Sequence, residues 1–313
     1  MIRLFVILLL IFINQIQAQD VHFSQFSKTK SLLNPALIVN QNNDYHVHLQ
    51  RRSQWSRVTV PFNTLALSFI AKKLYKETSL GATFLNDIAG DSYFSTNGLN
   101  LAVANSFNSK NNSLSVALLA GMYQRSVDFG GLIFVEEEDI GNTNFTFFDI
   151  GVGISNYRKI DRNSSLLVGM SAYHLNTPNQ SLIASNEAFL QPKYILHATY
   201  NKTITSKIKI APTFYLSSQK QDRELIIGSG VFYKSTNFVD LKSGVYSRMN
   251  DAIFVSFGLQ KENLEVLVSY DINTSSLSNA SNNMGGFEFS VNYGWSIIKG
   301  QEEVEQKVCP KYL

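Results

Sequence analysis

The feature that most constrains this fold is an alternation of apolar and polar residues that recurs from Asp44 almost to the C-terminus and is broken by turn-forming residues. In the last such stretch, Phe287, Phe289, Val291, Tyr293 and Trp295 alternate with Glu288, Ser290, Asn292 and Gly294. Successive side chains of a β-strand point to opposite faces, so each stretch is predicted to be a strand with one apolar and one polar face. The chain is therefore expected to be all-β.

The pattern predicts about 14 strands, an even number as in bacterial outer-membrane barrels. They are expected at residues 44–52, 62–72, 78–87, 93–107, 113–125, 145–157, 164–173, 193–202, 207–217, 224–234, 238–246, 252–260, 263–271 and 285–298. Short turns alternate along the chain with a second set of connections, and that set includes the long ones at 126–144, 174–192 and 272–284. A soluble β-sandwich, the alternative for alternating strands, has no reason to sort its loops in this way. The sequence thus predicts a transmembrane antiparallel β-barrel over residues 44–298, with both termini in the periplasm.

The composition fits a barrel exposed to lipid and disfavours other classes. The chain has 22 Phe and 14 Tyr among 313 residues, whereas charged residues make up 16%. A net charge of +3 without a run of Lys or Arg gives no support for nucleic-acid binding. The single cysteine, Cys309, excludes an intramolecular disulfide framework and a multi-cysteine metal site.

The first residues have the three parts of a secretory signal peptide. Arg3 precedes an apolar run over residues 4–13, and the small Ala18 precedes polar Gln19. An uncleaved membrane anchor is the alternative, but the apolar run is shorter than the roughly 20 residues that a spanning helix needs. We expect residues 1–18 to be removed after Ala18 and the mature chain to be exported.

Residues 19–43 lack the alternation and contain Pro35, so they cannot form a membrane strand. This segment is expected to be a plug in the barrel mouth or a periplasmic segment. It could be a contact surface for partner proteins, or a lid that packs into the barrel. At the other end, residues 299–313 are expected to form a polar periplasmic tail that carries the unpaired Cys309.

No motif in the sequence predicts catalysis, a cofactor or a metal site. His174 and His197 lie among many serines, but neither a nucleophile elbow nor a His-Glu-x-x-His motif is present. His46 and His48 share the polar face of one strand and are expected to line the lumen. The acidic run at 136–139 is expected to be a solvated loop, with calcium binding as the alternative.

Short motifs along the mature chain resemble those of the PorP/SprF family of type IX secretion proteins. They are Gln19-Asp20, then His22-Phe23-Ser24-Gln25-Phe26, Leu33-Asn34-Pro35-Ala36 and Gln54-Trp55, with further matches as far as Cys309-Pro310-Lys311-Tyr312. The resemblance implies a non-enzymatic component of the outer membrane that assists secretion or surface display of adhesins and, in gliding bacteria, motility. It implies contact with membrane lipid, with other secretion components on the periplasmic side and with a secreted cargo or adhesin.

The expected plug or partner contacts are His22, Phe23, Ser24, Gln25, Phe26, Asn34, Pro35 and Trp55. A passive pore, or a transporter for small hydrophobic solutes, is the alternative function, because strand number alone does not separate it from a secretion component.

Overall fold

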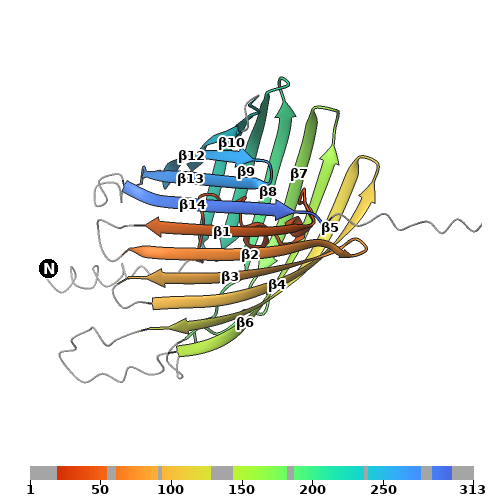
Figure 1. The fold of residues 1–313 in the computed structure, drawn as a ribbon. Coiled ribbons are helices and arrows are strands. Elements are labelled where there is room, and N and C mark those ends of the chain that lie inside the picture. Colours follow the sequence, from red (N-terminus) through yellow and green to blue (C-terminus); the bar gives the residue numbers. More distant parts are fainter. Residues whose placement is uncertain are drawn as a thin grey trace, which may run out of the picture.

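The computed structural model describes residues 20–54, 61–90, 94–127, 144–181, 187–235, 239–275 and 284–297. Within them the chain forms a closed barrel of 14 antiparallel strands, in which each strand pairs with its sequence neighbours and β1 pairs with β14 (Figure 1). The predicted fold is therefore confirmed. The predicted signal peptide, Trp55, the acidic run at 136–139 and the tail with Cys309 lie outside the described residues.

The strands of the barrel follow in chain order. They are β1 (Tyr45–Gln54), β2 (Phe62–Tyr75), β3 (Thr78–Ala89), β4 (Phe94–Ser109), β5 (Asn112–Ser126), β6 (Asn144–Lys159), β7 (Ser164–Tyr173), β8 (Lys193–Thr203), β9 (Ile208–Gln219), β10 (Asp222–Tyr233), β11 (Asp240–Arg248), β12 (Ala252–Lys261), β13 (Leu264–Asn273) and β14 (Met284–Trp295).

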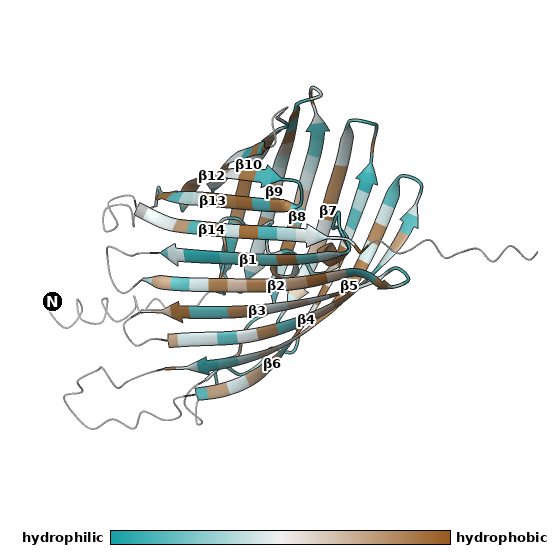
Figure 2. Cartoon of the chain, in the orientation of Figure 1, coloured by the Kyte–Doolittle hydropathy of each residue, from teal (hydrophilic) through white to brown (hydrophobic). Residues whose placement is uncertain are grey.

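The alternation in sequence becomes an alternation between the two faces of the wall. In β1, the side chains of His48, Gln50 and Arg52 are buried inside the barrel, whereas Leu49 points outward and is 36% exposed. Brown and teal bands alternate along many of the strands for the same reason (Figure 2). The outer face therefore presents an apolar surface, and the polar side chains line the lumen.

The connections define two ends of the barrel. The loop end carries the connections after odd-numbered strands, including the long segments 127–143, 174–192 and 274–283, and the turn end carries the connections after even-numbered strands. Loop lengths sort less cleanly than the sequence suggested, because two loop-end connections, 220–221 and 249–251, are as short as the turns. A tight hairpin needs only two residues, so nothing in the barrel geometry requires a long loop there.

Aromatic rings gather on the outer face at the turn end. The ring centroids of Tyr45 and Trp295 lie 5.5 Å apart, and those of Trp295 and Tyr293 lie 5.9 Å apart. Phe69 of β2 contacts the same group. Such clusters are typical of the membrane–water interface, where an aromatic ring can meet both lipid and water.

Residues 20–43, which we call the plug, lie inside the barrel and contain two short helical segments (Figure 1). Helix α2 spans Lys30–Leu33, and the 3-10 helix η1 spans Pro35–Val39 and packs against β2 to β6. Pro35 begins η1, where its missing N–H costs no hydrogen bond. Ala36 and Ile38 are fully buried, so the main apolar core of the described residues lies in the lumen. Neither of these segments is long enough to cross a bilayer, and no described helix is.

Candidate functional site: the plug and its seats in the barrel wall

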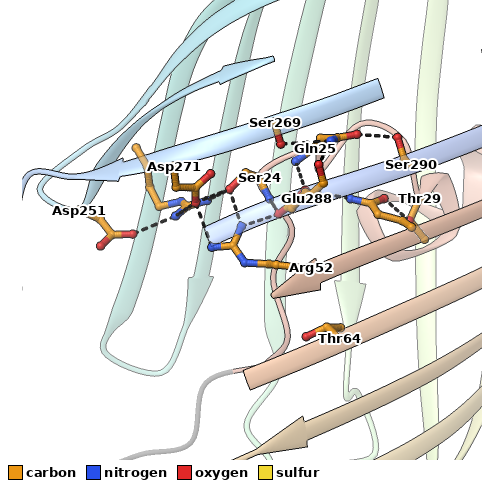
Figure 3. A network of polar contacts seen from close by, with 12 residues as sticks. Ser24, Gln25, Thr29, Arg52, Thr64, Asp251, Ser269, Asp271, Glu288 and Ser290 are labelled. Carbon is orange, nitrogen blue, oxygen red and sulfur yellow. Dashed lines mark hydrogen bonds and ion pairs between the residues drawn. The ribbon is translucent and has the colours of Figure 1, made fainter. Parts of the chain in front are cut away.

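The plug is held first by an ionic seat, in which Ser24 and Gln25 meet Glu288 of β14, Asp271 of β13 and Arg52 of β1 (Figure 3). The backbone N–H groups of Ser24 and Gln25 both donate to the Glu288 carboxylate, at 2.9 Å for Gln25. The Ser24 hydroxyl donates to Asp271 at 2.6 Å. Arg52 pairs with Glu288 and, at 3.0 Å, with Asp271. Two carboxylates and one guanidinium from three strands therefore fix two consecutive residues of the plug.

A second guanidinium extends the ionic seat to the neighbouring strands. Arg248 of β11 donates to the Ser24 hydroxyl at 2.6 Å and lies 3.3 Å from Asp271. It also pairs with Glu224 and Asp251, each at 2.9 Å. Arg52 and Glu288 are almost fully buried, and buried charges are tolerated only when they are paired and hydrogen-bonded. The seat is thus a connected network whose members depend on one another.

Gln25 adds neutral contacts to this seat. Its side-chain amide donates to Ser269 at 3.1 Å and accepts from Ser290 at 2.6 Å. A parallel link runs through Gln50, which accepts from Thr29 at 2.7 Å and donates to Glu288 at 3.1 Å. Gln50 therefore links Thr29 of the plug to the Glu288 carboxylate, and Gln25 fastens the plug to two serines of β13 and β14.

A neutral seat holds the plug on the opposite side of the lumen, where Asn34 meets β6, β7 and β8. The Asn34 amide donates to the carbonyl of Ile154 at 2.9 Å and to that of Met170 at 3.1 Å, and it lies 3.1 Å from His197 Nε2. Its carbonyl oxygen accepts from Ala36 N–H at 2.9 Å and caps η1. β7 and β14 are half a ring apart in the order of strands, so the two seats fasten the plug across the barrel.

Two glycines in the wall make room for the neutral seat. A Cβ on Gly153 of β6 would overlap the Asn34 side-chain oxygen and lie 2.9 Å from Pro35, and a Cβ on Gly169 of β7 would lie 2.7 Å from Asn34 Nδ2. Any larger residue would push the plug away from the strands. The wall therefore recognises the Asn-Pro motif by neutral hydrogen bonds and close fit, whereas it binds the Ser-Gln motif mainly through charged side chains.

The two phenylalanines of the plug anchor it in different directions. Phe23 is 5% exposed and packs with Ala66 and Leu85 on β2 and β3. Phe26 packs against the opposite wall, with its ring centroid 4.9 Å from that of Tyr215 and 6.3 Å from that of Tyr246. Each ring supplies apolar burial on one side of the polar Ser-Gln pair.

A small charged cluster fixes the beginning of the plug at the loop end. His174 Nε2 lies 2.6 Å from Asp20, and His174 Nδ1 lies 3.1 Å from Asp149. Burial alone would lower the pKa of His174, but the hydrogen bonds and charges of the two carboxylates raise it to about 9. Burial alone would raise the pKa of Asp20, but Lys193 and His174 hold it well below its usual range. Asp20 and His174 are therefore both ionised at neutral pH.

His22 has a different environment from His174. Burial and the positive charges of Arg248 and Arg52 hold the pKa of His22 well below its usual range, so the ring is neutral. Among the described residues, no group of His, Cys, Asp and Glu side chains is arranged to hold a metal ion.

Cavities flank the plug on both sides. A cavity of about 110 Å³ at the loop end is lined by Asp20, Leu85, Phe94, Tyr123, Arg125 and Phe147, among others. A larger and more polar cavity of about 280 Å³ lies at the turn end. The plug thus occupies the lumen between an aromatic chamber and a polar one.

The structure brings seven of the eight predicted site residues into the plug, and Trp55 is the one outside the described residues. The following wall partners were missed: Arg52, Arg248, Asp271, Glu288, His197, Gly153 and Gly169. Charged residues on the lumen-facing sides of the strands were the signal that could have located the ionic seat. The glycines gave no comparable signal.

Comparisons with known proteins add a family and a fold. A family profile described as "Type IX secretion system membrane protein PorP/SprF" matches residues 15–293. A search of curated proteins returned no match. The toluene transporter TbuX of Ralstonia pickettii aligns with a TM-score of 0.51 at 8% identity, over 84% of this chain and 92% of that chain. A FadL homologue of Pseudomonas aeruginosa aligns with a TM-score of 0.47 at 9% identity, over 84% and 93%. At such identities the likeness shows the fold alone.

Proposed function

Because the chain belongs to the PorP/SprF family of type IX secretion system membrane proteins, we propose that it assists the secretion or surface display of partner proteins as a non-enzymatic component of the outer membrane. Adhesins, including those used in gliding, are the partners we expect. The observation that supports this role is the plug: its Ser24 and Gln25 are buried in the lumen and bonded to charged wall residues. Because the plug fills the lumen, we favour a component that acts through the two ends of the barrel, and we disfavour an open pore.

We expect each surface of the barrel to contact a different partner. The apolar outer face contacts membrane lipid, the loop end faces the cell exterior and meets cargo, and the turn end faces the periplasm and meets other secretion components. A tag inserted after Asn142 should be labelled on intact cells, whereas a tag after Lys307 should be labelled only after permeabilisation. External labelling of the second tag would contradict this orientation.

Export itself rests on the proposed signal peptide. Cleavage after Ala18 would make Asp20 the second residue of the mature protein, next to its partner His174 in the barrel. Edman sequencing of the purified protein should therefore begin at Gln19.

The motif His22–Phe26 can contact a partner only after leaving its seat, because Phe23, Ser24 and Gln25 are each at most 5% exposed. We propose that partner binding competes with the wall for this segment. The ionic seat then acts as a latch, and its strength sets how readily the plug is released.

Phe23→Ala combined with Phe26→Ala tests this role, because it removes both anchors and leaves the strand ladder intact. In the native organism, with the gene deleted and restored as this variant, we expect a heat-modifiable barrel in the outer membrane but reduced surface delivery of partner proteins. Phe148→Ala with Phe257→Ala is the matched control, since those rings are 66% and 51% exposed on the outer face. Loss of the barrel itself would favour a purely structural lid, and normal delivery would remove the motif from the proposal.

A transporter for small hydrophobic solutes remains the second candidate, and the aromatic chamber at the loop end favours it. Leu85→Trp would narrow that chamber beside Phe23, and it replaces none of the residues of the ionic seat. If uptake of an apolar solute falls while secretion in the same cells is unchanged, the transport role is the correct one.

A further inference from the structure

The polar cavity at the turn end has a lining unlike that of the loop-end chamber. It has a volume of about 280 Å³ and lies between the plug and the wall. Its lining includes Lys28, Lys30, Asn40, Gln41, Lys242 and Glu265. Four of these residues belong to the plug, and the other two, Lys242 and Glu265, belong to β11 and β13. The cavity therefore exists only while the plug is seated.

The partly buried charges of this cavity do not balance. Lys28 and Lys242 share one carboxylate, Glu265, with Lys242 at 3.1 Å. Lys30 makes its hydrogen bonds to the Gln41 side-chain oxygen at 2.9 Å and to a backbone carbonyl, and no ion pair of Lys30 exists among the described residues. The other acidic residue of the lining is exposed at the rim. Three lysine side chains therefore share one partly buried carboxylate.

The ionisation of Lys30 reflects this imbalance. Burial and then the charge of Lys28 lower the pKa of Lys30 to about 7, although Glu265 opposes the effect. A lysine loses affinity for its proton in this way when a counter-charge is lacking. An anion in the cavity would supply that counter-charge.

Amide side chains make up much of the remaining lining. Asn40, Gln41, Asn43, Gln260, Asn263 and Asn292 all face the cavity. The side-chain amide nitrogen of Asn40 is buried and has no hydrogen-bond partner among the described residues. An amide both donates and accepts hydrogen bonds, which matches the hydroxyl groups of a sugar.

We propose that the turn-end cavity binds a small organic anion that also carries hydroxyl groups, such as a sugar phosphate or a sugar acid. The anionic group would lie between Lys30 and Lys242, and the hydroxyls would meet Asn40 and the other amides. The volume fits a molecule somewhat smaller than the ligands of typical pockets of roughly 300–1,000 Å³. This site is independent of the secretion role and faces the periplasm in the proposed orientation.

To test this proposal, the binding of sugar anions to the mature full-length protein in detergent is measured by titration calorimetry. Glucose 6-phosphate and gluconate should bind saturably, and neutral glucose should bind at least tenfold more weakly. Lys30→Met should lower the affinity at least tenfold, whereas Lys207→Met, at an exposed turn-end lysine, should change it less than twofold. Lys242→Met is the second variant if Lys30→Met fails to give a heat-modifiable barrel.

Three results would overturn the whole proposal, and a fourth would overturn one part of it. The first is the absence of saturable binding of either anion, and the second is an equal loss in the Lys207→Met control, which would indicate non-specific attraction. The third concerns the chain's own acidic tail: binding that appears only after Glu302→Gln, Glu303→Gln and Glu305→Gln would assign the cavity to the tail. Inorganic phosphate that binds as tightly as glucose 6-phosphate would overturn the role of the hydroxyls.

Discussion

The outer and inner faces of the barrel wall are made by the same strands but place different requirements on their side chains. On the outer face, Leu118 and Phe148 are 67% and 66% exposed, and any apolar side chain of suitable size would serve there. On the inner face, Gln50 and Glu288 are both 0% exposed and each has named partners in the plug or the wall. A substitution outside should therefore act through its polarity and depth, and a substitution inside through the partner that it loses.

The largest expected effect is that of Glu288→Ala on the inner face. Its carboxylate accepts from the backbone of Ser24 and Gln25 and pairs with Arg52, so its removal leaves a buried guanidinium and two N–H groups underpaired. We expect the free energy of unfolding to fall by about 3–5 kcal/mol, the usual cost of breaking a buried ion pair. Denaturant unfolding in detergent gives the value.

Two further variants sharpen this result. Glu187→Ala, at an exposed acid in a loop-end connection, is the matched control and should have little effect. Adding Arg52→Met to Glu288→Ala should recover part of the loss, because the guanidinium left with Asp271 as its one remaining carboxylate is then gone. A double variant that is less stable than the single one would contradict the network described for the ionic seat.

Val291→Arg is expected to have the next largest effect. Together with Asn292→Arg, it compares the two faces of one strand. Val291 lies outward in β14 opposite Leu49, whereas its neighbour Asn292 faces the turn-end cavity. An Arg that faces lipid near the midplane costs about 2–4 kcal/mol, but an Arg in the lumen stays hydrated. The yield of heat-modifiable protein in the outer membrane should fall much further for Val291→Arg than for Asn292→Arg. Equal yields would mean that the two faces are wrongly assigned.

The sequence predicted the outer face well because its information is local. Alternation within one strand is enough to assign Val291 outward and Asn292 inward, and to place the strand boundaries within a few residues, as for 145–157 against Asn144–Lys159. The turns were harder, since 220–221 and 249–251 showed that a loop-end connection can also be short.

The inner face could be predicted only in part, because its partners are far apart in sequence. The plug motif was recognised, but nothing in the order of residues reveals that Ser24 meets Asp271 and Glu288, which lie 247 and 264 positions away. The barrel register sets those contacts. The helical turn at Pro35–Val39 was also missed, since five residues are too few for a helical period to be visible.

Gly153→Ala tests the neutral seat and should have a smaller effect than loss of the ionic seat. The new methyl group would overlap the Asn34 side chain and lie 2.9 Å from Pro35, so the plug must shift. Overpacking of this kind costs about 1–3 kcal/mol. Gly230→Ala is the control, because its nearest atom is 3.3 Å away and belongs to the end of the Tyr246 side chain. If the two variants have the same unfolding midpoint, Asn34 is not tightly seated on β6.

The smallest expected effect is that of His174→Asn, because His174 ties down only the beginning of the plug through Asp20. Asn is the substitution of choice, since His174 has a φ of 58° and Asn tolerates this left-handed conformation. The pKa of His174 is raised in the folded protein to about 9, so the protonated ring stabilises the fold. That contribution is fully present below about pH 6.5, the pKa of an unperturbed histidine, and is lost as the pH rises through about 9. The difference in unfolding midpoint between the natural protein and His174→Asn should therefore shrink steadily over this window. A difference that stays constant from pH 6 to 10 would show that the charge of His174 does not contribute, and the start of the plug would then be held by neutral contacts, as the plug is at Asn34.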